Sequence, residues 1–355
     1  MNVLYVVQTP LHLLVATSLL YNNNNEVPFF QIEGELILKY SDSIRAIANQ
    51  LGGDLVGTCS GGGLKNSMKY FRRIFIKRVI PNRKQSRNIY DKVVVFSPSM
   101  NCVEIRQAYP NADFVLAEDG SGTYSGLIMS RKAYLDKHKN SNNSSSKLLK
   151  LIFGNTLFLN FSQVMVFRPD CVTYDYGIPI LPITIQDEAI ELYRKMIGDT
   201  ETQMSLANRA VFMGNFNPEI GLKDDEIIEL NELFRIMPNA LYRAHPRSSE
   251  KYEIDKMHVS KSWEVSCKTA NENTILVSMG SSGLTTPKMI YDTEPFLIFT
   301  YKLHRNMIPG FYSSFELSSE RAKKLYTNKN KVYAPDTIED YIDIIREIVD
   351  ISIDN

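Results

Sequence analysis

Short, uninterrupted apolar runs recur along this chain, each bounded by turn formers or by a stretch with helical spacing. The first covers residues 3–7, stops at Thr9-Pro10 and leads into apolar residues at helical spacing. Strands that are apolar on both faces and alternate with helices indicate parallel sheets covered on both sides. We therefore predict a doubly wound α/β fold, which binds ligands at the carboxyl ends of its strands. The later runs are 92–97, 113–117, 163–167, 209–213, 274–278 and 295–300.

The length of the chain predicts more than one domain. A single hydrophobic core rarely serves 355 residues, so we expect two. A proline-containing strip at 177–182 and a helix around 188–197 separate the earlier apolar runs from the later ones. We place the boundary near residues 180–205, which gives domains 1–190 and 191–355.

The composition excludes several classes of protein. Forty basic and forty acidic residues cancel, which disfavours a nucleic-acid binder held by phosphate neutralisation. The four cysteines lie far apart without metal-ligand spacing, so we expect a reducing compartment and no zinc site. The apolar N-terminus lacks a basic region and a cleavage site, and no run has the roughly 18 to 20 apolar residues of a spanning helix. A soluble or peripheral protein is expected.

One segment departs from the even charge balance. Residues 65–87 contain nine basic residues and no acidic one, interleaved with apolar side chains. A basic amphipathic helix of this kind can bind an anionic membrane face, gaining roughly 1 kcal/mol per charge. The alternatives are a solvated helix with one core face and a segment that binds an acidic acceptor or a nucleotide.

Two adjacent carboxylates, Glu118 and Asp119, follow the predicted strand at 113–117 and precede two glycines. Acids at the carboxyl end of a buried parallel strand lie where such folds bind ligands. Their mutual repulsion and partial burial raise the pKa of at least one of them, which favours general-base catalysis. The alternative is an acidic turn at a helix start, stabilised by the helix dipole.

A histidine between arginines follows a short apolar pair, in the order Arg243, Ala244, His245, Pro246 and Arg247. Because proline fixes the turn, we expect the imidazole at the exit of a strand. The arginines would form an anion site, and a histidine with a pKa near neutrality can act as the acid for a departing nucleotide. The alternative is a buried histidine that is part of the core and has no catalytic role.

A loop of small residues, with Gly280, Ser281 and Ser282, joins the run at 274–278 to a helical stretch at 284–291. Hydroxyls and backbone N–H groups at such a junction can bind an anion, with help from the helix dipole. Capping of the helix by either serine is an equal interpretation. The loop is not a Walker sequence.

The acidic pair, the His-Pro pair and the serine pair, in this order, resemble the D/E-D/E-G, HP and S-S/T motifs of bacterial sialyltransferases. These motifs occur in glycosyltransferase family 52 and in the related capsule polysialyltransferases. The opening Val6-Val7-Gln8-Thr9-Pro10-Leu11 also resembles the first strand and turn of family 52. That family often has glutamine at the position of His12, which leaves the role of His12 open.

The resemblance implies a GT-B fold, in which two Rossmann-like domains face a cleft, and it implies neither a metal nor a cofactor. Domain 1–190 would bind the acceptor and hold the base, and domain 191–355 would bind the CMP-sugar. The base would be Glu118 or Asp119, with the alternative that Asp224 or Asp225 takes this role. His245 would act on the CMP phosphate or leaving group. The donor-binding residues would be Arg243, His245, Pro246, Arg247, Gly280, Ser281 and Ser282.

The function implied by the resemblance is an inverting, metal-independent sialyltransferase. It would move sialic acid from CMP-sialic acid to a terminal galactose of a bacterial surface glycan, either lipooligosaccharide or capsule. The alternatives are a hexosyltransferase of the same fold with another nucleotide sugar and a non-catalytic, membrane-associated scaffold of polysaccharide assembly. We expect a cytoplasmic protein, peripheral on the inner membrane through 65–87. Its partners would be the nucleotide-sugar donor and the glycan acceptor, without nucleic acid and with a homodimer as one option.

Overall fold

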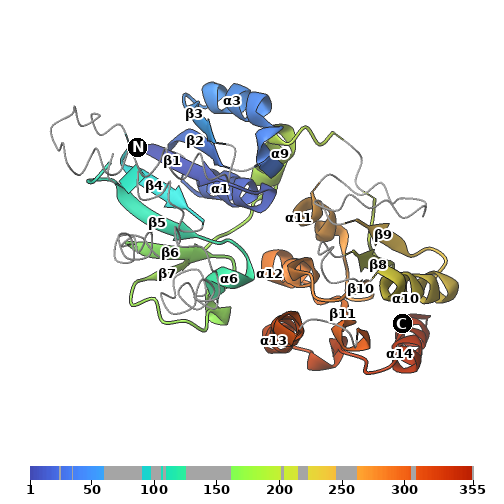
Figure 1. Ribbon diagram of the computed structural model, residues 1–355. Coiled ribbons are helices and arrows are strands. Elements are labelled where there is room, and N and C mark those ends of the chain that lie inside the picture. The colour runs from blue at the N-terminus through green and yellow to red at the C-terminus, as the bar shows by residue number, and fades with distance from the viewer. Residues whose placement is uncertain are drawn as a thin grey trace, which may run out of the picture. The chain divides into compact units, whose positions relative to one another are not determined.

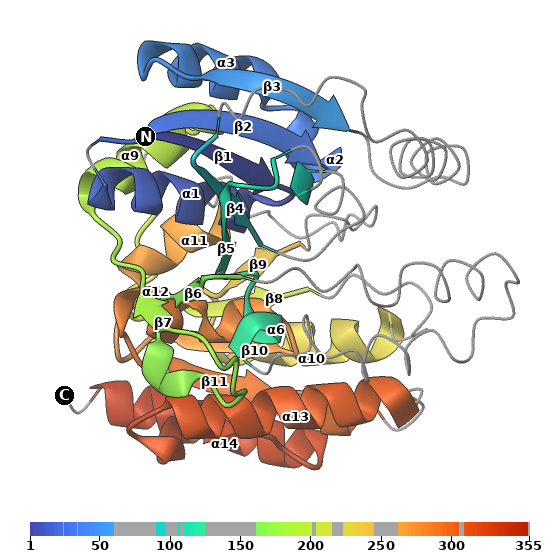
Figure 2. The same ribbon diagram turned by 90° about the vertical axis from the view of Figure 1, so that its left-hand side faces the viewer.

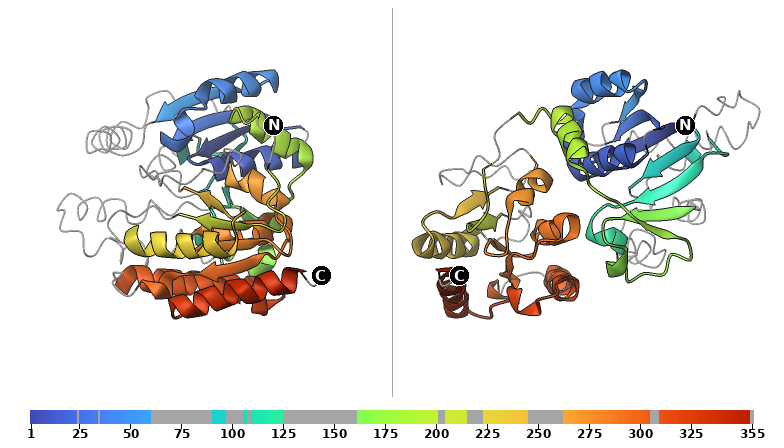
Figure 3. Two further views of the ribbon diagram at one scale, coloured as in Figure 1. Left: turned by 90° about the vertical axis from the view of Figure 1, so that its right-hand side faces the viewer. Right: turned by 180° about the vertical axis from the view of Figure 1, so that it is seen from behind.

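The chain divides into two compact units, Met1–Thr200 and Glu201–Asn355, each built on a parallel sheet (Figure 1). The division follows Thr200 rather than residue 190, because helix α9 (Asp187–Met196) packs against α1 (Pro10–Asn22) of the first unit. The two helices lie side by side in Figure 1 and again from behind in Figure 3. The computed structural model describes residues 1–59 except 24 and 34, 90–96, 105–106, 109–124, 161–200, 204–214, 223–244, 262–304 and 309–353.

The first unit contains a seven-stranded sheet in the order β3-β2-β1-β4-β5-β6-β7, with all neighbouring strands parallel. Figure 2 shows β1, β2 and β3 side by side. The strands are β1 (Asn2–Val7), β2 (Val27–Glu33), β3 (Asp54–Cys59), β4 (Lys92–Val95), β5 (Asp113–Ala117), β6 (Gln163–Val166) and β7 (Ile180–Pro182). The other helical elements are α2 (Glu35–Leu38), α3 (Ser41–Gln50), α6 (Ser121–Tyr124) and η1 (Pro169–Cys171).

The strand order of this sheet reverses between β1 and β4. The chain runs outward from β1 through β2 to β3, then returns to the other side of β1 and continues from β4 to β7. This is the order of the doubly wound nucleotide-binding folds, which bind ligands outside the carboxyl ends of the strands at the reversal. Both flanking strands are fully covered, since residues 3–7 and 93–95 are at most 1% exposed. Their uninterrupted apolar runs reflect that burial.

The second unit contains a five-stranded parallel sheet in the order β12-β11-β10-β8-β9, with its reversal between β8 and β10. The strands are β8 (Ala210–Met213), β9 (Leu241–Arg243), β10 (Ile275–Ser278), β11 (Phe296–Phe299) and β12 (Val332–Tyr333). The α-helices are α10 (Lys223–Ile236), α11 (Trp263–Ser266), α12 (Thr286–Tyr291), α13 (Pro309–Leu325) and α14 (Ile338–Ile353). The 3-10 helices are η3 (Cys267–Thr269), η4 (Ser282–Thr285), η5 (Tyr301–Leu303) and η6 (Lys329–Lys331).

Side chains of the second sheet alternate between two hydrophobic cores. Leu297 and Phe299 of β11 join the core that includes Ala322 of α13, whereas Ile298 joins the core that includes Tyr341 of α14. Figure 1 accordingly shows α12 and α13 on one side of this sheet and α10 and α14 on the other. Each fully buried aliphatic or aromatic side chain contributes roughly 1.5–3 kcal/mol. The predicted doubly wound architecture is therefore confirmed in both units.

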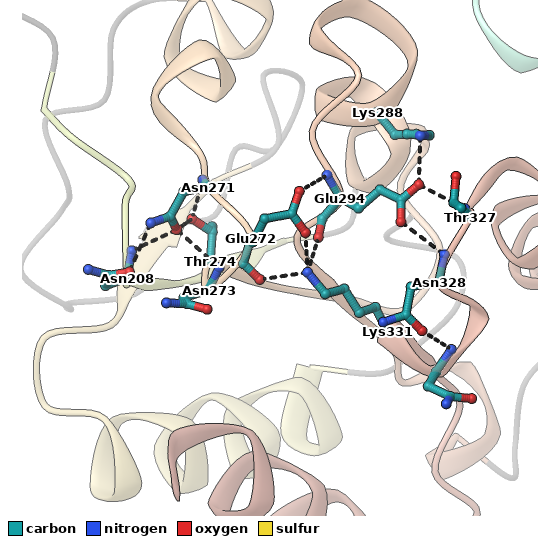
Figure 4. A network of polar contacts seen from close by, with 11 residues as sticks. Asn208, Asn271, Glu272, Asn273, Thr274, Lys288, Glu294, Thr327, Asn328 and Lys331 are labelled. Carbon is teal, nitrogen blue, oxygen red and sulfur yellow. Dashed lines mark hydrogen bonds and ion pairs between the residues drawn. The ribbon is translucent and has the colours of Figure 1, made fainter. Parts of the chain in front are cut away.

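A polar network closes the amino edge of the second sheet (Figure 4). Asn271, before β10, accepts at Oδ1 from the backbone N–H of Asn208, before β8, at 3.1 Å. Glu294, before β11, accepts from Lys288 Nζ at 2.6 Å, and its carbonyl accepts from Lys331 Nζ at 2.9 Å. The network ties the starts of neighbouring strands together, so it lies at the edge opposite the loop that follows β10.

The segment proposed for membrane contact, 65–87, lies outside the described residues. Among the helices that the structure does describe, none combines the length and the apolar character needed to cross a membrane.

Candidate active site

The two carboxylates that follow β5 have different surroundings. Glu118 is only 2% exposed, and its Oε2 accepts from the hydroxyl of Tyr124 at 2.6 Å and from the N–H of Phe167 at 2.8 Å. Burial raises the pKa of Glu118, and the two hydrogen bonds lower it. Burial has the larger effect, so the pKa is about 8. The side chain of Asp119, by contrast, is 29% exposed. Asp119 is therefore the carboxylate of this pair that solvent reaches.

Asp119 contacts His12, which lies in the first turn of α1. The other ring nitrogen of His12, Nδ1, accepts from the backbone N–H of Gln8 at 3.1 Å. Because Nδ1 is an acceptor, the proton of the neutral ring lies on Nε2 and is donated to Oδ1 of Asp119. The imidazole also stacks on the ring of Phe96, with centroids 4.3 Å apart and an angle of 6° between the planes. Three contacts thus fix the ring and its tautomer.

Local backbone structure places both members of this pair. Thr9 is the N-cap of α1, and its hydroxyl accepts from the backbone N–H of His12 at 3.3 Å. The backbone N–H of Asp119 donates to the hydroxyl of Thr123 at 2.9 Å. Gly120 has φ +84°, a conformation that L side chains rarely adopt, and it turns the chain away directly after the carboxylate.

The pair lies at the strand-order reversal of the first sheet. His12, Phe96 and Asp119 follow β1, β4 and β5, which are neighbours in the sheet. The polar row continues to the end of β2, where Glu33 accepts from Gln8 Nε2 at 3.3 Å. Sequence reasoning identified Asp119 but not the contribution of His12 or Phe96. The sequence signal that could have identified His12 and Phe96 is their position, because each follows an apolar strand of one parallel sheet.

The serine loop after β10 is held by its own hydrogen bonds. The N–H of Ser281 donates to Ser278 Oγ at 3.3 Å, and Ser281 Oγ accepts from the N–H of Gly283 at 3.2 Å. Ser281 is thereby the N-cap of η4, so the helical stretch expected at 284–291 begins as a 3-10 turn and becomes α12 at Thr286. The neighbouring Ser282 is exposed.

Gly280 and Gly283 bring this loop close to its neighbours. A Cβ atom on Gly280 would lie 2.1 Å from Cδ1 of Phe315 on α13. A Cβ atom on Gly283 would lie 2.4 Å from Cε of Met213, the last residue of β8. Only glycine permits these approaches. The loop is consequently packed over the end of β8, at the reversal of the second sheet.

Arg243, the last residue of β9, and the serine loop both contact the ring of Trp263. The guanidinium carbon of Arg243 is 5.1 Å from the ring centre of Trp263, and the indole Nε1 donates to the carbonyl of Gly283 at 2.8 Å. The N–H of Gly214 donates to the Arg243 carbonyl at 2.9 Å, which fixes the backbone at the strand end. Sequence reasoning missed Trp263, although it is the only tryptophan of the chain.

Several predicted site residues take no part in the contacts described above. His245, Pro246 and Arg247 lie outside the described residues, and Asp224 and Asp225 lie in the first turn of α10. Within the described parts of the chain, no group of three or more His, Cys, Asp or Glu side chains is arranged to hold a metal ion.

Comparison with known proteins relates the fold to solved structures. No family model matches the sequence, and no curated protein matches it. The GT-B domain of a sialyltransferase from Photobacterium damselae has a TM-score of 0.50 at 13% identity, over 94% of this chain and 99% of that one. The glycotransferase of kitacinnamycin has a TM-score of 0.49 at 10% identity, over 98% and 99%. The UDP-GlcNAc 2-epimerase from Neisseria meningitidis has 0.44 at 12%, over 98% and 99%.

The two doubly wound parallel sheets and the match to the sialyltransferase domain define the fold of this chain as GT-B. The predicted fold class is confirmed.

Proposed function

We propose that this chain is an inverting, metal-independent glycosyltransferase that transfers sialic acid from CMP-sialic acid to a terminal galactose of a bacterial surface glycan. The observation that carries the proposal is the partly exposed carboxylate of Asp119, held by the neutral imidazole of His12 at the ligand-binding edge of a GT-B sheet. The choice of sialic acid is supported by the order of the acidic, His-Pro and serine motifs.

On the acceptor side, Asp119 acts as the general base. His12 holds Oδ1 through its Nε2–H, so Oδ2 accepts the proton of the acceptor hydroxyl. The hydroxyl oxygen then attacks the anomeric carbon of the sialyl group as the bond from that carbon to the CMP phosphate oxygen breaks. Glu118 does not serve as the base in this scheme, because its raised pKa keeps it protonated at neutral pH and its carboxyl is buried.

On the donor side, the phosphate of CMP binds between Arg243 and the hydroxyls of Ser281 and Ser282. A guanidinium can donate two parallel hydrogen bonds to a phosphate, and it stays charged throughout. His245, in its expected place after β9, donates a proton to the phosphate as CMP leaves. Charge that develops at the leaving group is thus stabilised by residues of the second unit alone.

The test is product formation from CMP-sialic acid with a panel of galactosides in the presence of EDTA. We expect Asp119→Asn and His245→Ala each to lower kcat by about 100-fold or more. The matched control is Asp113→Asn, which removes an exposed carboxylate at the amino end of the same strand, β5. If Asp119→Asn kept full activity and Asp224→Asn or Asp225→Asn lost activity, the base would be a residue of α10.

The same assay separates the alternatives. Turnover of another nucleotide sugar, with CMP-sialic acid unused, would define a hexosyltransferase. A chain that binds no nucleotide sugar, measured as the absence of any rise in Tm, would support the non-catalytic scaffold. Peripheral attachment through 65–87 is tested by sedimentation of the full chain with anionic vesicles, where neutral vesicles and high salt should abolish binding.

A further inference from the structure

Trp263 connects the two segments that would bind the donor phosphate. It begins α11, is only 3% exposed, and belongs to the core on the α13 side of the second sheet. The guanidinium carbon of Arg243 lies over the ring, 5.1 Å from the ring centre, and the Nε1–H of the indole donates to the Gly283 carbonyl at 2.8 Å. One rigid side chain therefore contacts both a strand-end arginine and the serine loop.

The contact with Gly283 has little freedom to adjust. A Cβ atom at Gly283 would lie 3.2 Å from Trp263 Nε1 and 2.4 Å from Met213 Cε, so the indole and the thioether occupy the space beside this glycine. The N–H of Gly283 is bonded to Ser281 Oγ at 3.2 Å. A displacement of the indole would thus be transmitted through Gly283 to the hydroxyl of Ser281.

The contact with Arg243 limits the guanidinium in a similar way. A cation over the face of an indole is attracted by the negative charge of the ring face, and tryptophan gives the strongest such contact. The backbone of Arg243 is already fixed by the bond from the Gly214 N–H. The indole thus restricts the remaining freedom of the side chain, next to the loop that carries Ser281 and Ser282.

We propose that Trp263 is a positioning residue of the donor site, which sets the guanidinium of Arg243 and the hydroxyl of Ser281 at the spacing required by the phosphate of a nucleotide. The inference rests on the proposed function, because it takes the ligand to be the phosphate of CMP. Since Trp263 is the only tryptophan in the chain, its fluorescence also reports binding of the phosphate.

Two substitutions separate the contacts of the indole. Trp263→Phe keeps an aromatic face for Arg243 but removes the N–H donated to Gly283, and Trp263→Leu removes both. We expect Trp263→Phe to raise KM for CMP-sialic acid about tenfold, the factor that corresponds to about 1.4 kcal/mol and to one lost buried hydrogen bond. Trp263→Leu should raise it further, and kcat should fall in both variants, because Arg243 and Ser281 also stabilise the charge that develops on the leaving phosphate.

A purely structural role predicts a different pattern. The control is Tyr326→Leu, which truncates another aromatic residue of the same core, adjacent to the network at the amino edge of the sheet. We expect this variant to lower Tm without raising KM. If Trp263→Phe and Trp263→Leu behave like Tyr326→Leu, with lower Tm and unchanged KM, the positioning role is wrong.

Fluorescence of the unmodified chain gives an independent test. We expect CMP to produce a saturable change in tryptophan emission, which Arg243→Ala reduces and Arg235→Ala, an exposed arginine on α10, leaves intact. A change with UMP or UDP but not with CMP would support the positioning role and overturn the CMP donor. Calorimetric binding of CMP without any change in emission would overturn the positioning role and leave the proposed function standing. Absence of binding by all three nucleotides would overturn both.

Discussion

His12 and Asp119 are separated by 107 positions in the sequence, yet their side chains share a hydrogen bond at the carboxyl edge of the first sheet. His12 is completely buried beneath the contact, whereas Asp119 is partly exposed. Because Gln8 donates to Nδ1, the ring presents only Nε2–H to the carboxylate. The histidine therefore orients the carboxylate of Asp119 through one of its two oxygens.

Replacement of His12 should test this relationship directly. We expect His12→Ala to lower kcat about 10- to 100-fold, because Asp119 loses the donor that orients it, while KM for the nucleotide sugar stays unchanged. His12→Gln should retain most of the activity, since a carboxamide N–H can replace Nε2–H. Steady-state kinetics with both substrates check this, and equal activity of the alanine and wild-type enzymes would contradict it.

The buried acid Glu118 should make stability depend on pH. Its pKa is about 8 in the folded chain, against an ordinary value of 4.5, so between these values the folded state holds a proton that the unfolded state has lost. The free energy of unfolding should therefore decrease as pH rises from about 4.5 to about 8. Glu118→Gln cannot titrate, so its stability relative to wild type should improve across that range. Urea unfolding at pH 5, 6.5 and 8 measures this, and parallel curves would refute it.

Glu294 should show the opposite dependence. Burial alone would raise its pKa, but bonds from Lys288 and from the N–H groups of Thr327 and Asn328 outweigh burial and lower the pKa to about 2. Its contribution is therefore complete above the ordinary value of 4.5 and is lost as pH falls toward 2. We expect Glu294→Gln to destabilise the fold by about 2 kcal/mol at neutral pH.

The difference between Glu294→Gln and wild type should shrink in acid, as measured by urea unfolding. The matched control is Glu347→Gln, an exposed glutamate on α14, for which we expect a change within about 0.5 kcal/mol. KM for the donor should be unaffected, because the network lies at the amino edge of the sheet. A raised KM would mean that the two edges are coupled.

Gly280 and Phe315 should be energetically coupled. Gly280→Ala would place a Cβ atom 2.1 Å from the Phe315 ring, which must then move. We expect this substitution to lower stability and to weaken CMP binding, and Phe315→Ala to relieve part of the loss, with an interaction energy of about 1–3 kcal/mol in a double-mutant cycle. Gly57→Ala is the control, since its Cβ would meet only ordinary contact at 4.0 Å. Strict additivity would contradict the steric explanation.

Local sequence determined the central strands, because burial on both faces demands a continuous apolar run. Strands β1, β4, β5, β6, β8, β10 and β11 all coincide with such runs. The sequence did not reveal β2 and β3 in the same way. In β2 buried and half-buried positions alternate, and Pro28 interrupts the run, while β3 contains Gly57 and begins at Asp54. Edge and near-edge strands need less apolar surface, so their local signal is weaker.

For the candidate site, the sequence determined which chemical groups follow the strands, and only the tertiary structure decided which groups meet. The sequence showed the acidic pair after β5, but the proposed choice of Asp119 over Glu118 depended on the burial of Glu118 and on the hydrogen bonds that it accepts from Tyr124 and Phe167. The pairing of His12 with Asp119 depended on the order in which β1, β4 and β5 lie in the sheet. Strand order is set by contacts between distant segments, and no local pattern of residues encodes it.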